Sequence, residues 1–169
     1  MTVRALGCGL LLVLVAGCGG TKTVTRTVTV DAAAKKGVGA PGESVLFGHI
    51  KSLTRKGSGY VLRFDPALLL TGETANVAAA EDGAVPPGEP VPNDNYVVDE
   101  GHRLFTYLVP ANAKVTVLTK SPEGTPITVA ELAEIVAGHH KPLWESIETG
   151  FWLRARIDTV RSIDQQYHP

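Results

Sequence analysis

The residues from Phe151 to Asp158 alternate between apolar and polar side chains more sharply than any other segment of the chain. Successive side chains of an extended strand point to opposite sides of the sheet. One face of this strand would carry Phe151, Leu153, Ala155 and Ile157, and the other face would carry Trp152, Arg154, Arg156 and Asp158. The pattern predicts a strand with one apolar and one polar face, and residues 160–163 are expected to return as its hairpin partner.

Other short apolar runs, each bounded by Pro, Gly or Asn, predict further strands. These runs cover residues 45–53, 60–64, 96–98, 104–109 and 114–118, and the first two are expected to form a hairpin around a glycine-rich turn. Two helices are also expected. An Ala-rich helix over residues 74–80 would be closed by Gly83. The second would begin at a capping box made by Thr128 and Glu131 and end at Gly138.

These elements do not repeat a strand–helix–strand spacing, so a parallel sheet is not indicated. Six to seven short strands with two short helices predict an α+β domain. The expected architecture is a small, mainly antiparallel sheet or an OB-like barrel. The domain would cover residues 44–169, a common size for one core.

The chain begins like an exported protein, with Arg4 as its only early charge and a run of 13 mainly apolar residues over 5–17. A helix needs about 20 such residues to span a bilayer. Residues Val15-Ala16-Gly17-Cys18 resemble the lipobox of bacterial lipoproteins. The resemblance implies cleavage after Gly17, a lipid on Cys18 and anchoring to the extracytoplasmic face of the cell membrane. The alternatives are an ordinary cysteine at position 18 or later cleavage by another peptidase.

Residues 18–43 are expected to form the lipidated end and a Thr-, Gly- and Ala-rich tether, with an added edge strand as the alternative. Removing residues 1–17 takes away Arg4 and no acid, so the formal charge changes from −1 to −2. This balance gives no indication of nucleic acid binding. Loss of Cys8 leaves Cys18 as the remaining cysteine, which excludes internal disulfides and thiol catalysis. No motif indicates a cofactor.

The polar face of the 151–158 strand is one candidate ligand site, because Trp152, Arg154 and Arg156 would line one surface. An aromatic ring beside two guanidinium groups can stack on a sugar and pair with an anion, as an envelope glycan would require. The alternative is that Trp152 packs against the C-terminal segment while the arginines pair with neighbouring Asp and Glu side chains.

A second candidate is a metal site with the carboxylates and imidazole of Asp94, Asp99, Glu100 and His102, beside a proline-rich loop. Hard oxygen ligands suit divalent cations. The spacing matches no EF-hand or zinc motif, and acidic loop residues are commonly just solvated. This segment carries the alternative hypothesis of a cation-dependent enzyme.

Several short sequence segments are similar to domains of uncharacterised secreted proteins and lipoproteins of high-GC Gram-positive bacteria. They are Phe47-Gly48-His49-Ile50, residues 60–66, Pro92-Asn93-Asp94, and Phe151-Trp152 through Gln165-Gln166-Tyr167. The resemblance implies no activity, cofactor or site residue. The sequence therefore favours a membrane-anchored binding or scaffolding module with an envelope glycan or an extracellular protein as its partner.

Overall fold

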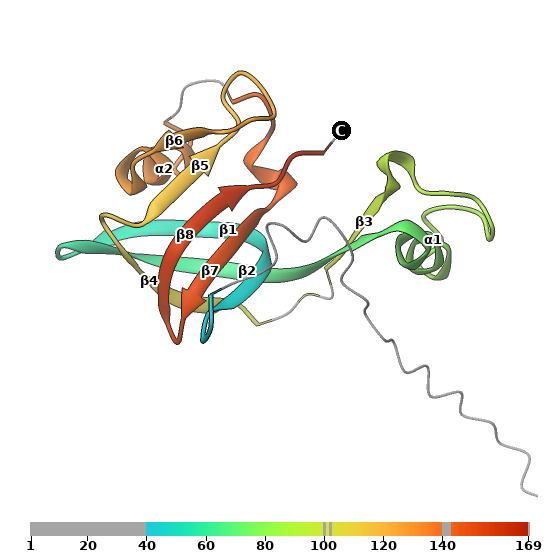
Figure 1. Ribbon diagram of the computed structural model, residues 1–169, viewed down its shortest axis with the longest axis horizontal. Coiled ribbons are helices and arrows are strands. Elements are labelled where there is room, and N and C mark those ends of the chain that lie inside the picture. The colour runs from blue at the N-terminus through green and yellow to red at the C-terminus, as the bar shows by residue number, and fades with distance from the viewer. Residues whose placement is uncertain (1–39, 100, 102, 140–142, 169) are drawn as a thin grey trace, which may run out of the picture.

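A computed structural model describes residues 40–99, 101, 103–139 and 143–168. The predicted signal peptide, Cys18 and most of the predicted tether lie outside these residues. Within the described residues there are eight strands and two α-helices (Figure 1). They are β1 (Ser44–Lys56), β2 (Gly59–Thr71), α1 (Gly72–Glu81), β3 (Asn95–Val98), β4 (Phe105–Pro110), β5 (Lys114–Val117), β6 (Thr125–Ile127), α2 (Val129–Val136), β7 (Phe151–Arg156) and β8 (Thr159–Gln165), with short 3-10 helices η2 (Pro92–Asp94) and η3 (Ile147–Thr149).

Five strands close into a barrel in the order β1-β2-β4-β8-β7, with β7 returning to β1. Within the barrel all pairs are antiparallel except β4 with β8, which meet in parallel at Leu108 and Thr159. Two bulges interrupt the ladders, one at Lys51 in β1 and one at Arg161 in β8. Bulges bend and twist a strand, as closure of a small barrel requires. The predicted α+β class and the OB-like barrel are confirmed.

The barrel is filled by the inward faces of its strands, which place Leu62, Phe64, Phe151, Leu153 and Ile163 in one buried cluster. Helix α2 packs on the same cluster through Val129 and Leu132. Its capping box is present: the Thr128 hydroxyl accepts from the Glu131 amide, and the Glu131 carboxylate accepts from the Thr128 amide at 2.8 Å. The predicted helix and its start are confirmed.

A smaller lobe projects from the barrel and contains the end of β2, β3, α1 and η2 (Figure 1). Its own core consists of Leu70, Ala75, Ala78, Ala79, Val91 and Val98. The side chain of Asn76 ties the proline-rich loop to α1, because its Oδ1 accepts from the Val91 amide at 2.8 Å. The predicted Ala-rich helix is confirmed, and Gly83 with φ of 72° follows it.

Strand β2 differs from the sequence prediction because it continues past Asp65-Pro66, where a turn is the common outcome, as far as Thr71. Pro66 lies opposite Gly48, close to the point where β2 leaves β1 and begins to pair with β3. The sheet tolerates a residue without an amide hydrogen at such a position. The strand thereby connects the barrel core to the lobe core. None of the helices in the described part of the chain is long and apolar enough to cross a membrane.

Candidate functional site

A hollow of about 530 Å³ opens at the seam where the barrel closes. Strand β4 touches β8 at Leu108, and β5 rejoins β8 at Lys114 opposite Ser162. Between these points the chain turns away from β8, with the Ala113 amide donating to the Pro110 carbonyl at 2.9 Å. Because of this turn, this edge of β8 has no partner among the described strands between its contacts with β4 and β5, and the hollow opens there.

The walls of the hollow come from the β1–β2 turn, the end of β4 and the first residue of β8. They consist of Lys56, Ser58, Gly59, Tyr60, Leu108, Val109, Pro110, Ala111, Asn112 and Thr159. Gly59 is required by close packing, because a Cβ there would lie 2.9 Å from the carbonyl oxygen of Val109. The walls therefore offer apolar surface, neutral hydrogen-bonding groups from Ser58, Asn112 and Thr159, and one cation, Lys56.

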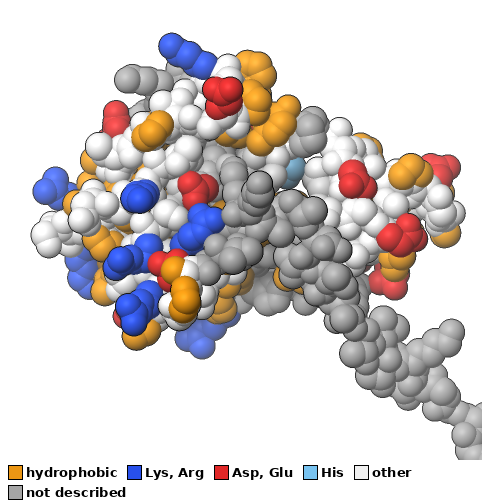
Figure 2. All heavy atoms as spheres, in the orientation of Figure 1, with side chains coloured by type: hydrophobic (Ala, Val, Ile, Leu, Met, Phe, Trp, Pro, Cys, Tyr) orange, Lys and Arg blue, Asp and Glu red, His pale blue; other side chains and the backbone are white. Residues whose placement is uncertain are grey.

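Charge is segregated between the barrel and the lobe. The sequence has no Lys or Arg between Arg63 and Arg103, whereas the lobe carries exposed acids at Glu73, Glu81, Asp82, Glu89, Asp94 and Asp99. Figure 2 shows Lys and Arg side chains together with some Asp and Glu over the barrel, whereas the charged side chains visible on the α1 lobe are Asp and Glu. Among the exposed cations of the barrel, Lys56 lines the hollow, Arg55 precedes it in the chain, and Arg156 lies opposite the lining residue Thr159. The charge distribution therefore favours an anionic ligand at the barrel over one at the lobe.

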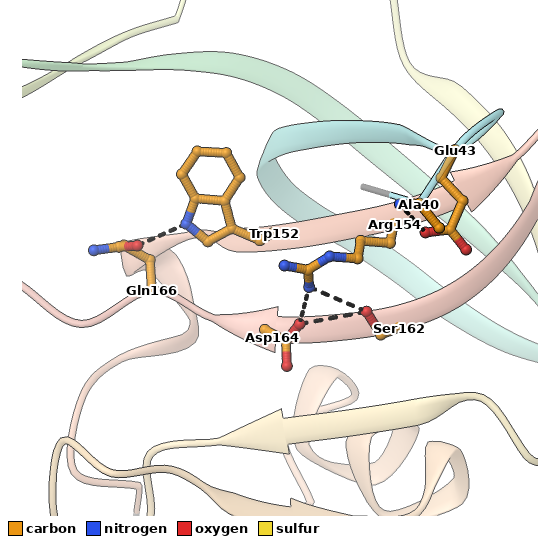
Figure 3. A network of polar contacts seen from close by, with 7 residues as sticks. All are labelled: Ala40, Glu43, Trp152, Arg154, Ser162, Asp164 and Gln166. Carbon is orange, nitrogen blue, oxygen red and sulfur yellow. Dashed lines mark hydrogen bonds and ion pairs between the residues drawn. The ribbon is translucent and has the colours of Figure 1, made fainter. Parts of the chain in front are cut away.

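Trp152 and Arg154 do share one surface of β7, as the alternation predicts, but β8 and the residue that follows it supply partners for both (Figure 3). The indole Nε1 of Trp152 donates to Gln166 Oε1 at 2.7 Å, and the ring lies 5.2 Å from that of Phe47. The Arg154 guanidinium pairs with Asp164 Oδ2 at 2.8 Å and lies 3.4 Å from the Ser162 hydroxyl. Arg156 is exposed next to the β7–β8 turn.

These contacts match the alternative in which Trp152 packs and Arg154 pairs with a neighbouring carboxylate. The side chains of Arg154 and Asp164 are both 21% exposed, so the pair is accessible along its edge only. As a ligand site, the set Trp152, Arg154 and Arg156 stays a prediction.

The metal-site hypothesis falls on residues that the structure describes only in part. Asp94 and Asp99 are exposed in the lobe, and Asp99 Oδ1 accepts from the Gly101 amide at 3.0 Å. Glu100 and His102 lie outside the described residues. Among the residues described, no group of three or more His, Cys, Asp or Glu side chains is arranged to hold a metal ion. The hypothesis of a cation-dependent enzyme stays a prediction.

Asp65 is the buried carboxylate of the barrel wall, with 7% of its surface exposed. Its Oδ2 pairs with Lys51 Nζ at 3.0 Å, and its buried Oδ1 has no hydrogen-bond partner among the residues that the structure describes. Lys51 is the extra residue of the β1 bulge, which aims its side chain at Asp65. The sequence gives no signal for this pair, because it depends on the bulge.

A scan against models of known protein families and searches of curated proteins and of solved structures find no match to this chain.

Proposed function

We propose that this protein is a lipid-anchored binding module of the bacterial cell envelope, and that its barrel binds an acidic envelope glycan in the seam hollow. The signal-like N-terminus and the lipobox at Cys18 support the location. The hollow carries the binding part of the proposal, because it combines apolar wall, neutral hydrogen-bonding groups and a cation in one concave site.

The position of the hollow within the barrel adds to this argument. Barrels of the OB type bind oligosaccharides and oligonucleotides on the face of their second and third strands, between the loops that join strands one and two and strands four and five. The corresponding parts here are β2, β4, the β1–β2 turn and the β7–β8 turn, and the hollow is lined by the first three of these and by Thr159, which follows the β7–β8 turn. This likeness is one of architecture and carries no residue roles.

The chemistry of the walls favours a sugar polymer that bears negative charge. Hydroxyl and amide groups at Ser58, Asn112 and Thr159 match sugar hydroxyls, and the exposed apolar surface of Leu108 matches the face of a sugar ring. Lys56 supplies a charge-assisted hydrogen bond to a carboxylate or phosphate group.

The first experiment uses residues 18–169 with Cys18→Ala, so that no acyl chain contributes, and measures binding to acidic and neutral envelope polysaccharides by calorimetry. Lys56→Glu and Asn112→Ala are expected to weaken binding, Lys56→Glu by about tenfold or more, because a charged hydrogen bond is worth about 1.5–3 kcal/mol. Lys120→Glu is the matched control, since Lys120 is exposed and does not line the hollow.

Unchanged affinities in both hollow variants would refute the hollow as the site, and loss of binding in Trp152→Ala and Arg156→Ala would move it to the β7 face. The anchor is tested separately on the full chain. Intact mass should show added diacylglyceryl mass in the wild type but not in Cys18→Ala, and fractionation in high salt, which screens electrostatic binding to lipid headgroups, should leave only the wild type with the membrane. Identical behaviour of the two chains would contradict the location.

A further inference from the structure

We infer that the β7–β8 turn is a docking tip that inserts Ile157 into the surface of an anionic lipid bilayer. This inference rests on the proposed anchoring at Cys18 and adds a second membrane contact made by the folded domain itself. It is carried by the conformation of Ile157, its apolar neighbour, the charges around the turn and the place where the tether enters the domain.

Ile157 is the most exposed large apolar residue of the described chain, at 91% exposure. It also has a φ of 59°, which is a genuine outlier for a β-branched side chain. Asp158, the other central residue of the turn, does not have a positive φ. A two-residue hairpin turn with positive φ at its first position normally has Gly there. The hairpin therefore exposes an isoleucine to water in an unfavourable backbone conformation. Residues held in such conformations cluster at functional sites.

Leu108 extends the apolar surface of the tip. Its amide donates to the Asp158 carbonyl at 2.8 Å, and the residue lies opposite Thr159 in the parallel contact between β4 and β8. Leu108 is 49% exposed. The turn and the adjacent strand thus present two aliphatic side chains to solvent at the same place.

Three exposed arginines lie in the strands next to these two side chains. Arg156 precedes Ile157, Arg161 follows in the β8 bulge, and Arg63 on β2 donates to Thr106 of β4 at 2.7 Å. The nearby carboxylates are Asp158, which accepts from the Thr159 hydroxyl, and Glu43, which accepts from the Ala40 amide. Apolar residues flanked by cations suit the boundary between headgroups and acyl chains of an anionic bilayer.

The tether enters the domain at this tip. Ser44, the first residue of β1, lies opposite Ala155 of β7, and Figure 1 shows the start of β1 beside the β7–β8 turn. Only the 25 residues 19–43 separate this point from Cys18. The acidic lobe projects away from the barrel, and an orientation that brings this lobe to an anionic bilayer is less favourable than one that brings the tip to it.

The test uses residues 18–169 with Cys18→Ala, whose two cores are formed within the described residues, and measures co-sedimentation with phosphatidylglycerol and phosphatidylcholine vesicles. The parent chain is expected to bind the phosphatidylglycerol vesicles, and binding should fall as salt is raised. Ile157→Asp should lower the partition coefficient by about tenfold or more, because burial of an isoleucine side chain is lost.

Ile157→Gly separates docking from folding. It relieves the positive-φ strain, so it should raise the melting temperature while it lowers vesicle binding. Val77→Asp is the control, because Val77 is 49% exposed on α1 and this variant should bind as the parent does.

The inference is overturned if the parent chain does not bind phosphatidylglycerol vesicles, if it binds both lipids equally, or if Ile157→Asp and Ile157→Gly bind as the parent does. Asn112→Ala keeps the two proposals apart, since it should lose glycan and keep vesicle binding, whereas Ile157→Gly should do the reverse. Loss of membrane association in Cys18→Ala cells concerns the anchor and not the tip.

Discussion

Gln165 shows how much a single polar side chain can organise inside this barrel. It is 1% exposed, its Oε1 accepts from the Leu118 amide at 2.9 Å, and its Nε2 donates to the Ser146 carbonyl at 3.0 Å. The Glu145 carbonyl lies 3.3 Å from the same nitrogen. One side chain therefore links the end of β8 to the segment after β5 and to the loop before η3.

Gln165→Leu is expected to destabilise the fold by about 2–4 kcal/mol, because buried backbone groups lose their partners and each costs about 1–3 kcal/mol. Chemical denaturation followed by fluorescence measures the change. Arg161→Gln, an exposed substitution on the same strand, should change stability by about 0.5 kcal/mol or less. A Gln165→Leu protein as stable as the wild type would mean that water replaces the amide.

The sequence predicts which side chains share a face of β7, but it cannot predict their partners. Alternation is a property of one strand, and it places Trp152 and Arg154 together correctly. Their partners Gln166 and Asp164 depend on the register of β8, which includes the bulge at Arg161. A shift of one residue in that register would turn every β8 side chain to the other face.

At the scale of elements, strands and helices with strong local patterns are predictable, whereas their association is not. The capping box of α2 and the β1–β2 and β7–β8 hairpins follow from local residues. The lobe does not, because α1 is rich in alanine and β3 has only four residues. Their shared core appears only when β2 continues through Pro66. The hollow likewise depends on the β4–β8 seam, a contact between segments far apart in sequence.

The tyrosine of β3 makes the lobe sensitive to alkaline pH. Burial, followed by the hydrogen bond to Asp82 Oδ2 at 3.2 Å, raises the pKa of Tyr96 above its ordinary value of 10.0. A raised pKa means that the unfolded chain loses its proton first. The stabilising contribution is therefore complete below pH 10 and is lost as pH rises through the folded pKa.

Tyr96→Phe should consequently be less stable than the wild type near pH 8, and its melting temperature should fall less steeply above pH 10. Thermal melts from pH 8 to about 11.5 measure both effects. Tyr107→Phe is the comparison, because burial alone raises the pKa of Tyr107. Parallel curves for wild type and Tyr96→Phe would show that the Tyr96 hydroxyl ionises freely in the folded lobe.

At the scale of the whole molecule, the two cores differ in their capacity to stand alone. The barrel core contains large side chains such as Phe64, Phe151 and Leu153, whereas three of the six buried residues of the lobe core are alanine. Strand β2 passes through both cores, so the lobe depends on the barrel for the position of its longest strand. We therefore expect loss of the lobe core to be local and loss of the barrel core to be global.

Leu70→Ala removes the largest aliphatic side chain buried in the lobe core, which is 5% exposed, at a cost of about 2–5 kcal/mol. Hydrogen exchange should accelerate at the amides of α1 and β3 and stay unchanged at those of β7 and β8. Leu153→Ala, in the barrel core, should accelerate exchange in all four elements, because the lobe cannot persist without β2. Equal acceleration throughout the Leu70→Ala chain would show instead that the barrel and the lobe unfold as one cooperative unit.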